Sequence, residues 1–490
     1  MHRPRFIAAA TLSVLALVAG ACGGSKDSSG GTDTTDAATA NLPKCPVDAF
    51  KKASGVTTIK VWHSYVGKTQ QSLEKIASEY NASQSKVKVE VEVQGNSYAE
   101  LLKKFQAAIP TKQLPAITIG EDIDTQFMKD SGTVLPATSC LNADAPAKKQ
   151  VTDILPAVRA AYTIDGVQYP ASMNVSTIML YYNREHFRKA GLDPDKPPTT
   201  LDEVKADAEK LKAAGVSSKP FVMKMDPWFL EQWITGAHQT MVNNNNGRTK
   251  TADASTLDNP AAKTAMEWLD SMNKEGLLNA VPGTDGQFNH YLAMAVGSSS
   301  MLIETSAGIT TIDGVLTGTF DPKDLGPNVA LPAGLQVSID LGVAKNPGLT
   351  EAGVGQVGGG AWYMTNTGSD AEQSAAWDFI KYFNTTKSQV EWTTEGSYLP
   401  ILTSAQKDPA LQADWTTSQR GKWLAIAYSG IESLDPKFPG ALIGPYTEFR
   451  NQFRTAIEGV TLNGAAPDDS LKTASAAITD ELAKYAKNNF

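Results

Sequence analysis

Histidine and cysteine are scarce in this chain of 490 residues, which holds five histidines and three cysteines. The histidines are scattered, at His2, His63, His186, His238 and His290. None of them has the paired spacing of a zinc site, and no CxxC pair is present. These absences exclude zinc enzymes of the HExxH and CxxC types, and we expect neither a metal nor a cofactor.

The sequence has no long basic run and no common catalytic motif. Its 44 Lys and Arg stand against 52 Asp and Glu, for a formal net charge of −8, so nucleic acid is not expected as a partner. Neither GxxxxGK[ST] nor GxSxG occurs. His63 and Ser64 are neighbours at the end of a predicted strand, and adjacent side chains in extended chain point to opposite faces, so they are not expected to pair as base and nucleophile. We therefore expect no catalytic residues.

The segment 353–358 fits the dinucleotide-binding pattern GxGxxG. That pattern binds a pyrophosphate only when it follows a strand and opens a helix. Here a loop-like NPGLTEA precedes it and GGAWYM, a strand pattern, follows it. A dinucleotide site is therefore not expected.

Long apolar runs are confined to the N-terminus. Residues 6–18 are apolar, follow a basic start, and form a run shorter than the roughly 20 residues of a membrane span. Small residues and then Cys22 come next. The pattern predicts an export signal over 1–21 and resembles a bacterial lipobox, in which Cys22 would carry lipid. A free or buried cysteine, or cleavage nearby without lipid, is the alternative.

Residues 22–50 are predicted to be a lipid anchor and flexible tether, because 23–40 consists of Gly, Ser, Thr and Asp with almost nothing apolar. Export implies an oxidising compartment. With Cys22 used for lipid, Cys45 and Cys140 remain as an even pair. They either form a disulfide or stay as two unpaired thiols.

The body of the chain has an α/β pattern and is long enough for two or more lobes. A strand at 57–62, a helix at 68–80 and an alternating strand at 86–93 predict a βαβ unit, whose ligands bind beyond the carboxyl ends of the strands. This places 63–65 and the turn 95–98 at a cleft edge. Further helices are predicted at 200–214, 261–274, 371–383 and 448–460, and further strands at 178–182, 300–303 and 361–364.

Eight segments of this chain resemble segments of one known protein family, and they follow one another in the same order as in that family. They are VWHSYVG, QGNSYAELLKKFQAAI, LPAI, YPASMNVSTIMLYYNREHFRKAGLDPDKPPTTLDE, MLIETSAG, GGGAWYM, EGSYLPI and GPYTEFR. From about Thr57 to the C-terminus the chain resembles the extracellular solute-binding proteins of ABC importers, in their sugar-binding cluster. Within that family, WHS, EGSYLPI and GPYTEFR favour the glycerophosphate-binding branch.

The resemblance implies a two-lobed, periplasmic-binding-protein-like (type II) α/β fold with three hinge crossings. We expect the crossings near Ser176, at Met301–Glu304 and at Gly359–Trp362. Lobe 1 would then hold 56–176 and 304–359, and lobe 2 would hold 177–303 and 360–490. The protein would carry out no chemistry. As a monomer held to the outer face of the cell membrane by its lipid, it would close on a small-molecule substrate and deliver it to the membrane subunits of a permease.

The resemblance also carries over a ligand-binding set. Its members are Tyr98, Asp122 (with Glu121 adjacent and equally acidic), Ser176, Ser306 (or Thr305), Gly359, Tyr398 and Arg450. Arg450 can meet a phosphate with a bidentate fork, and the amides of the glycine run at 358–360 can form an anion nest. The carboxylate at Asp122 suits ligand hydroxyls. This set favours glycerol 3-phosphate or a glycerophosphodiester as the ligand.

Several alternatives remain open from the sequence. The alternatives are an Arg450 that pairs only with Glu448 or Glu458, a glycine run that serves as a hinge, a Ser176 that caps the hinge, and tyrosines that are packing residues. Trp228 and Trp233 could stack on a sugar or belong to the core, so an oligosaccharide or other polyol is the second candidate ligand. A secreted hydrolase is a third hypothesis, which lacks a nucleophile–base pair.

Overall fold

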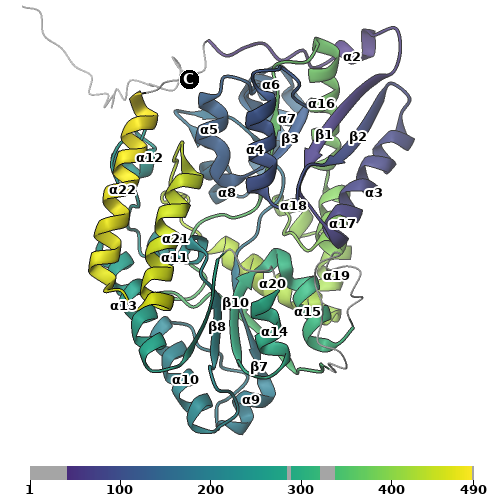
Figure 1. Cartoon of the computed structure of the whole chain (residues 1–490). Helices are drawn as coiled ribbons and strands as arrows, with labels where there is room; N and C mark the ends of the chain where they lie inside the picture. Colours follow the sequence, from purple (N-terminus) through teal and green to yellow (C-terminus); the bar gives the residue numbers. More distant parts are fainter. Residues whose placement is uncertain (1–40, 284–287, 320–336, 488–490) are drawn as a thin grey trace, which may run out of the picture.

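The structure is a computed structural model that describes residues 41–283, 288–319 and 337–487. Within these residues the chain forms two α/β lobes, each built on a five-stranded sheet and drawn one above the other in Figure 1. The expected signal at 1–21, Cys22 and the first part of the tether lie outside the described residues. No helix in the described part of the chain is long and apolar enough to cross a membrane.

The first lobe contains the predicted βαβ unit. Its sheet has the order β2-β1-β3-β12-β6, with β1 at Thr57–His63, β2 at Val87–Val93, β3 at Ile117–Glu121, β12 at Gly360–Met364 and β6 at Ala171–Ser172. β1 and β2 are parallel, and α3 (Gly67–Ser83) connects them. Leu73 and Ile76 of α3 are fully buried. The helix predicted from the 3.6-residue period at 68–80 and the strand predicted from the two-residue alternation at 86–93 are thus confirmed as α3 and β2.

Helices surround the first sheet. They are α2 (Ala49–Lys52), α4 (Tyr98–Ala108), α5 (Thr125–Asp130), α6 (Ala137–Ala143), α7 (Ala145–Gln150), α8 (Pro156–Ala161), α16 (Asp370–Phe383), α17 (Thr386–Gly396) and α18 (Thr403–Gln406). Short 3-10 turns lie at η1 (Asp122–Asp124) and η2 (Val151–Asp153), and a small hairpin joins β4 (Thr163–Ile164) to β5 (Val167–Gln168). In Figure 1 the green helices α16 and α17 lie in the purple and blue upper lobe, so the chain returns there late in the sequence.

The second lobe repeats this sheet plan. Its order is β11-β7-β10-β8-β9, with β7 at Ile178–Asn183, β8 at Phe221–Lys224, β9 at Leu278–Val281, β10 at Met301–Thr305 and β11 at Leu341–Lys345. β12 in the first sheet and β7 in the second each run antiparallel to both of their neighbours. Each of these two strands comes directly after a passage of the chain between the lobes.

The second lobe is rich in helices. They are α9 (Arg184–Lys189), α10 (Leu201–Ala213), α11 (Pro227–Gly236), α12 (Asn243–Gly247), α13 (Pro260–Lys274), α14 (Asn289–Ala295), α15 (Ile309–Thr317), α19 (Pro409–Thr417), α20 (Gln419–Glu432), α21 (Tyr446–Asn463) and α22 (Pro467–Lys487), with a 3-10 turn η3 at Ser306–Gly308. The predicted helices at 200–214, 261–274, 371–383 and 448–460 are confirmed to within a few residues. α10 is capped by Thr200, whose hydroxyl accepts from the amide of Glu203, while the carboxylate of Glu203 accepts from the amide of Thr199.

The boundaries of the lobes differ from those expected. β10 lies wholly in the second sheet, so no crossing occurs at Met301–Glu304, and β11 places 341–345 in the second lobe rather than the first. β12 belongs to the first sheet, so Gly359 leads into the first lobe instead of out of it. The physical reason is pairing between distant strands: β11 pairs with β7 and β12 with β3, contacts that local pattern does not reveal.

Within the described residues three passages of the chain nevertheless join the lobes: 173–177, 357–359, and the segment after α17 that contains Leu399 and leads through α18 to α19. They are bonded side by side. Ser176 and Gly358 exchange backbone hydrogen bonds of 2.8 and 3.1 Å, and Val175 and Leu399 exchange bonds of 3.3 and 2.9 Å. Val175, Val357 and Leu399, one from each crossing, are buried in the same apolar cluster. The crossings thus form one packed hinge region.

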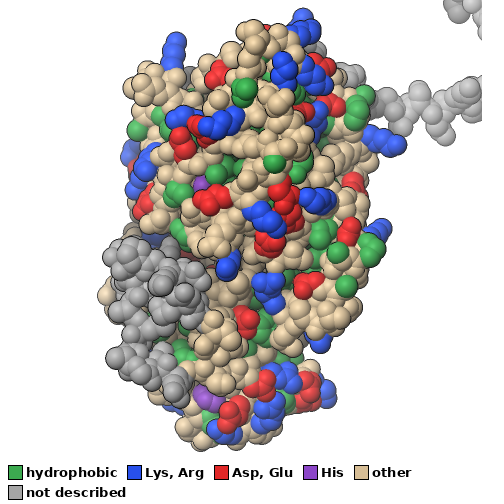
Figure 2. Space-filling model, turned by 90° about the vertical axis from the view of Figure 1, so that its right-hand side faces the viewer, with side chains coloured by type: hydrophobic (Ala, Val, Ile, Leu, Met, Phe, Trp, Pro, Cys, Tyr) green, Lys and Arg blue, Asp and Glu red, His purple; other side chains and the backbone are tan. Residues whose placement is uncertain are grey.

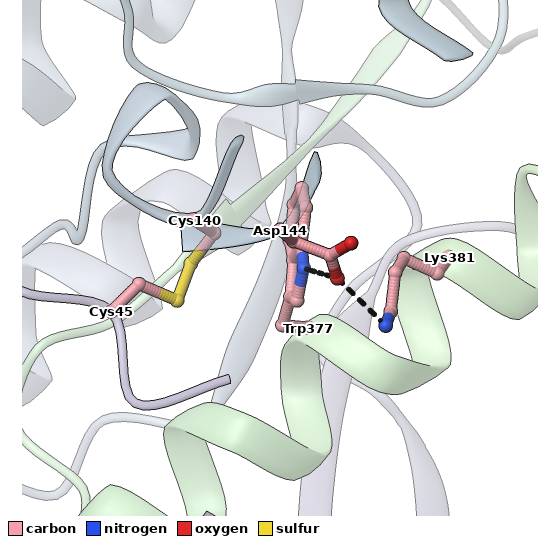
Figure 3. The surroundings of a disulfide bond; sticks show 5 residues. All are labelled: Cys45, Cys140, Asp144, Trp377 and Lys381. Carbon is pink, nitrogen blue, oxygen red and sulfur yellow. Dashed lines mark hydrogen bonds and ion pairs between the residues drawn. A yellow bond between two sulfur atoms is a disulfide. The ribbon is translucent and has the colours of Figure 1, made fainter. Parts of the chain in front are cut away.

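The N-terminal segment is part of the first lobe. Cys45 and Phe50 are buried, and α2 packs against α16, so the folded body begins before residue 50, the expected end of the tether. Cys45 and Cys140 are joined by a disulfide. Beside it the carboxylate of Asp144 accepts hydrogen bonds from Trp377 at 3.1 Å and Lys381 at 2.9 Å (Figure 3). These contacts fasten the start of the body to α6 and α16.

The face shown in Figure 2 carries a mixed surface. Lys and Arg side chains alternate with Asp and Glu over it, and the hydrophobic side chains are scattered among them. This face therefore offers no broad apolar docking surface among its described residues, which directs attention to the region between the lobes.

Candidate ligand-binding site

The hinge supplies the first part of the site. Gly359 has a φ of +127°, and a Cβ there would lie 2.8 Å from the side-chain oxygen of Asn174. A side chain is therefore excluded by conformation as well as by space. The amide of Asp122 donates to the carbonyl of Gly359 at 3.1 Å, and the amide of Gly360 donates to Asn174 at 2.8 Å. The amide of Gly358 also donates within the protein, to the carbonyl of Ser176 at 3.1 Å, so neither Gly358 nor Gly360 offers a free amide to the expected anion nest.

A tyrosine cluster lies next to this turn. The hydroxyl of Tyr98 donates to that of Tyr65 at 3.1 Å and lies 3.4 Å from that of Tyr398. Asn174 donates to Tyr65 at 2.9 Å. Burial raises the pKa of Tyr398 to about 12, so its phenol keeps its proton at neutral pH and can donate. The cluster presents hydroxyls and apolar ring faces together, a combination that suits a polyol.

Local structure places Tyr98 at the first position of α4. Ser97 caps the helix by accepting from the amide of Glu100 at 3.2 Å, and Glu100 in turn accepts from the amide of Asn96 at 2.9 Å. This capped turn follows β2, so Tyr98 stands beyond the carboxyl ends of the parallel strands, as the βαβ pattern predicts.

Arg450 supplies a cation to the site and is tied to two carboxylates. Its Nε and Nη2 each donate at 2.9 Å to Glu231 of α11, and its Nη1 donates at 2.8 Å to Glu121 of β3. Its guanidinium also lies over the ring of Tyr446, 5.2 Å from the centroid. Glu448 and Glu458, the partners considered from the sequence, are not bonded to it; Glu458 accepts from Gly283 instead. Arg450 and Glu231 belong to the second lobe and Glu121 to the first, so this ion-pair group spans the gap between the lobes.

Carboxyl groups outnumber the cation here. Burial opposes the charge on Arg450, yet Glu231 and Glu121 hold the pKa of Arg450 well above its ordinary value. Burial, and then Glu121, raise the pKa of Asp122 well above its ordinary value, and burial likewise raises the pKa of Asp124. The raised pKa values mean that burial destabilises the ionised forms of Asp122 and Asp124. Carboxyl groups of this kind are frequent at functional sites.

Ser176 and Ser306 both lie at the hinge region. The hydroxyl of Ser306, fully buried, accepts from the amide of Thr177 at 3.1 Å, and the amide of Ser306 donates to the carbonyl of Thr177 at 2.7 Å. Thr305 caps the following turn. The side chain of Ser176 lies beside Gly358, where a Cβ would come within 3.1 Å of its hydroxyl oxygen. Both serines thus lie where 173–177 meets its neighbours.

The two tryptophans separate into different roles. Trp233 is buried, and its indole donates to the carbonyl of Pro347 at 3.0 Å, so it belongs to the core of the second lobe. Trp228 is half-buried and lies against Gly358, where a Cβ would come within 2.6 Å of its ring. Trp228 is therefore at the hinge and beside the site.

His63 forms no catalytic pair with Ser64. It is buried, its Nδ1 accepts from the amide of Tyr65 at 3.2 Å, and burial lowers its pKa to about 4. The imidazole is therefore neutral at physiological pH and helps to hold the turn that carries Tyr65.

A groove of about 510 Å³ opens between the lobes on the side of Tyr446. α4 and α5 of the first lobe line it, with the start of α21 and the end of α22 from the second lobe. Its walls include Leu102, Lys103, Ile123, Asp124, Tyr446 and Lys484. Tyr446 lies in the groove wall and its hydroxyl donates to Glu231, but Arg450, Glu121, Tyr98 and Tyr398 do not line the groove.

The structure thus brings four of the eight expected residues together in two groups. Tyr98 and Tyr398 meet in the tyrosine cluster, while Glu121 and Arg450 meet across the gap. Glu231 and Asn174 were not anticipated from the sequence. A signal existed for Glu231, because it is the one charged residue in the apolar segment PWFLEQWITG. No group of three or more His, Cys, Asp or Glu in the described part of the chain is arranged to hold a metal ion.

The chain is similar in sequence to known solute-binding proteins. The chain is 26% identical over 431 residues to the sn-glycerol-3-phosphate-binding periplasmic protein UgpB of Yersinia enterocolitica, covering 86% of this chain and 91% of that protein. It is 26% identical over 437 residues to the protein of the same name from Brucella abortus, covering 87% and 94%.

Two solved structures share the fold. UgpB from Mycobacterium tuberculosis in complex with glycerophosphocholine superposes with a TM-score of 0.69 at 17% identity, covering 89% of this chain and all of that one. A cyclic α-maltosyl-1,6-maltose binding protein from Arthrobacter globiformis superposes with a TM-score of 0.68 at 22% identity, covering 88% and 100%. These likenesses confirm the two-lobed type II fold. Residues 75–418, more than half of the chain, match one family, and the chain belongs to the bacterial extracellular solute-binding proteins.

Proposed function

We propose that this protein is the substrate-binding component of an ABC importer and captures glycerol 3-phosphate or a glycerophosphodiester between its lobes. The observation that carries the proposal is the group formed by Arg450, Glu121 and Glu231 beside the tyrosine cluster. A guanidinium with carboxylates and phenols at one lobe interface offers donors for a phosphate and acceptors for glycerol hydroxyls. The names of the Yersinia and Brucella relatives support this ligand class.

Closure of the lobes is the proposed working motion. A solute that contacts Arg450 from one lobe and Tyr98 from the other stabilises the closed arrangement, because only there does it meet both. The three bonded crossings allow such a hinge motion while they keep the lobes in register. A permease in the membrane then recognises the closed form and takes up the solute from it.

The N-terminus suits this role. An exported chain that carries lipid on Cys22 and a polar tether would stay at the outer face of the cell membrane, as a monomer near its permease. A Cys22→Ser variant is expected to move from the membrane fraction to the medium while it keeps its thermal stability. Retention of that variant in the membrane would contradict the anchor.

A sugar or polyol is the second candidate, favoured by Trp228 against Gly358 and by the surplus of carboxyl groups, which accept hydrogen bonds from hydroxyls. A thermal-shift screen over glycerol 3-phosphate, glycerophosphodiesters and maltose-type sugars separates the two. A bound ligand stabilises by about 2.7 kcal/mol at a hundredfold excess over its Kd. Stabilisation by glycerophosphates is expected, and stabilisation by sugars alone would reject the leading proposal.

A further inference from the structure

Glu231 is the most completely buried charged group of the site. Its side chain has no exposed surface, whereas that of Arg450 is 15% exposed. One carboxylate oxygen accepts from Nε of Arg450, and the other accepts from Nη2 and, at 3.3 Å, from the hydroxyl of Tyr446. A buried carboxylate with three donors is fixed in place, and it fixes the guanidinium in turn.

This pairing uses one of the two edges of Arg450 that can bind a phosphate bidentately. A guanidinium has five N–H donors, and its Nε–Nη2 edge forms one of the two forks that bind an oxyanion bidentately. Glu231 occupies that fork. Nη1 donates to Glu121, so three of the five N–H donors are used and two remain, one on Nη1 and one on Nη2. An incoming anion therefore meets a guanidinium that has two donors left and whose Nε–Nη2 fork is already occupied by Glu231.

The charges around Arg450 also limit the negative charge that a bound anion can carry. Glu231 balances the single positive charge of Arg450. Glu121 faces the same guanidinium from the first lobe at 2.8 Å, and Asp226 lies near Glu231 in the second. A phosphate monoester carries about −1.5 to −2 charges near pH 7, while a phosphodiester carries one. A second negative charge on the ligand would be repelled by Glu121 and Glu231, and Glu231 already balances the charge of Arg450.

We propose that Glu231 is a specificity-determining residue which makes the site select a monoanionic phosphodiester over a dianionic phosphate monoester. The inference rests on the proposed function, because it concerns the ligand of the same site. Glu231 acts through Arg450: it orients the guanidinium and cancels its charge.

The test compares two probes at pH 7.5 by calorimetry: glycerol 3-phosphate, and glycerophosphoglycerol, a diester without a cationic group. The wild type is expected to bind the diester at least tenfold more tightly. Glu231→Gln keeps the size of the side chain and removes its charge, so the ratio of the two Kd values is expected to shift at least tenfold towards the monoester. That shift corresponds to about 1.4 kcal/mol.

Two further variants separate charge from structure. Glu231→Asp keeps the charge and is expected to retain the preference for the diester even where its overall affinity falls. Glu267→Gln removes an exposed carboxylate from α13 in the same lobe and is expected to leave the ratio unchanged. A purely structural role for Glu231 would change both affinities together in Gln and Asp variants alike.

The outcomes distinguish the two proposals. A wild type that binds neither probe would reject the proposed function and this inference with it. A wild type that prefers the monoester, or a Glu231→Gln ratio within twofold of wild type, would overturn only the role of Glu231. A parallel shift in Glu231→Asp would overturn it as well.

Discussion

Arg450 of α21 and Glu121 of β3 reach from opposite lobes and meet at 2.8 Å, so one ion pair bridges the gap in which a solute would sit. Their side chains are 15% and 22% exposed, which leaves the pair only partly screened by solvent. A ligand that needs Arg450 must compete with Glu121 for it. The same contact therefore links the two lobes, and its energy opposes the binding of any ligand that replaces Glu121 on Arg450.

Removal of this bridge should loosen the unliganded protein. Glu121→Gln takes away the charge that attracts Arg450, so the equilibrium between closed and open lobes shifts towards open forms. We expect a larger radius of gyration in small-angle X-ray scattering without ligand. Glu74→Gln, on the exposed side of α3, is the control and should leave the scattering unchanged. An unchanged radius in Glu121→Gln would show that the pair does not hold the lobes.

The pair of Arg450 and Glu231 should show strong coupling in stability. Glu231→Leu alone leaves a buried guanidinium short of a partner, a change that costs about 3–5 kcal/mol in comparable cases. The double variant Glu231→Leu with Arg450→Leu removes both charges and should regain most of that loss. Urea denaturation of the two single variants and the double variant measures the coupling. Simple additivity of the two losses would mean that the ion pair is not formed in solution.

Asp122 should make stability depend on pH. Its pKa in the folded protein is raised above the unfolded value, so the folded state binds the proton more tightly. Stability from this group therefore falls as pH rises from the unfolded pKa, near 3.9, through the folded one. Asp122→Asn is expected to stabilise the unliganded protein most at neutral pH and little near pH 4. Thermal melts across this range measure the difference, and a constant difference would contradict the raised pKa.

Gly360 should be intolerant of a side chain. A Cβ there would lie 2.6 Å from the hydroxyl oxygen of Tyr65 and 2.7 Å from that of Tyr98. Gly360→Ala is therefore expected to cost about 1–3 kcal/mol of stability through overpacking and to weaken ligand binding by displacing the tyrosines. Gly55→Ala is a suitable control, because its Cβ would have no neighbour within 4 Å. Equal melting temperatures for the two variants would show that the cluster is more open than described.

Local pattern predicted the local structure well. The period of α3 and the alternation of β2 depend on residues close in sequence, so they identified the βαβ unit and, through it, the position of Tyr98. The division into lobes was wrong at β11 and β12, because a strand's place in a sheet depends on pairing with strands far away in the chain.

The site shows the same limit. Tyr98, Tyr398, Glu121 and Arg450 were expected through resemblance to a family, and the structure places them in two connected groups. The partner of Arg450 was not found, because Glu231 lies 219 residues earlier in the chain. A lone carboxylate in an apolar helix is the signal that could have identified it, since a buried charge requires a partner.

The most direct test of the central claim is calorimetric titration of the wild type and of Arg450→Ala with glycerophosphoglycerol. We expect the wild type to bind, and the variant to lose affinity at least tenfold, because a charged hydrogen bond contributes about 1.5–3 kcal/mol. A circular dichroism spectrum like that of the wild type would show that the variant is folded. Equal affinity of the two proteins, or the absence of binding by the wild type, would contradict the account.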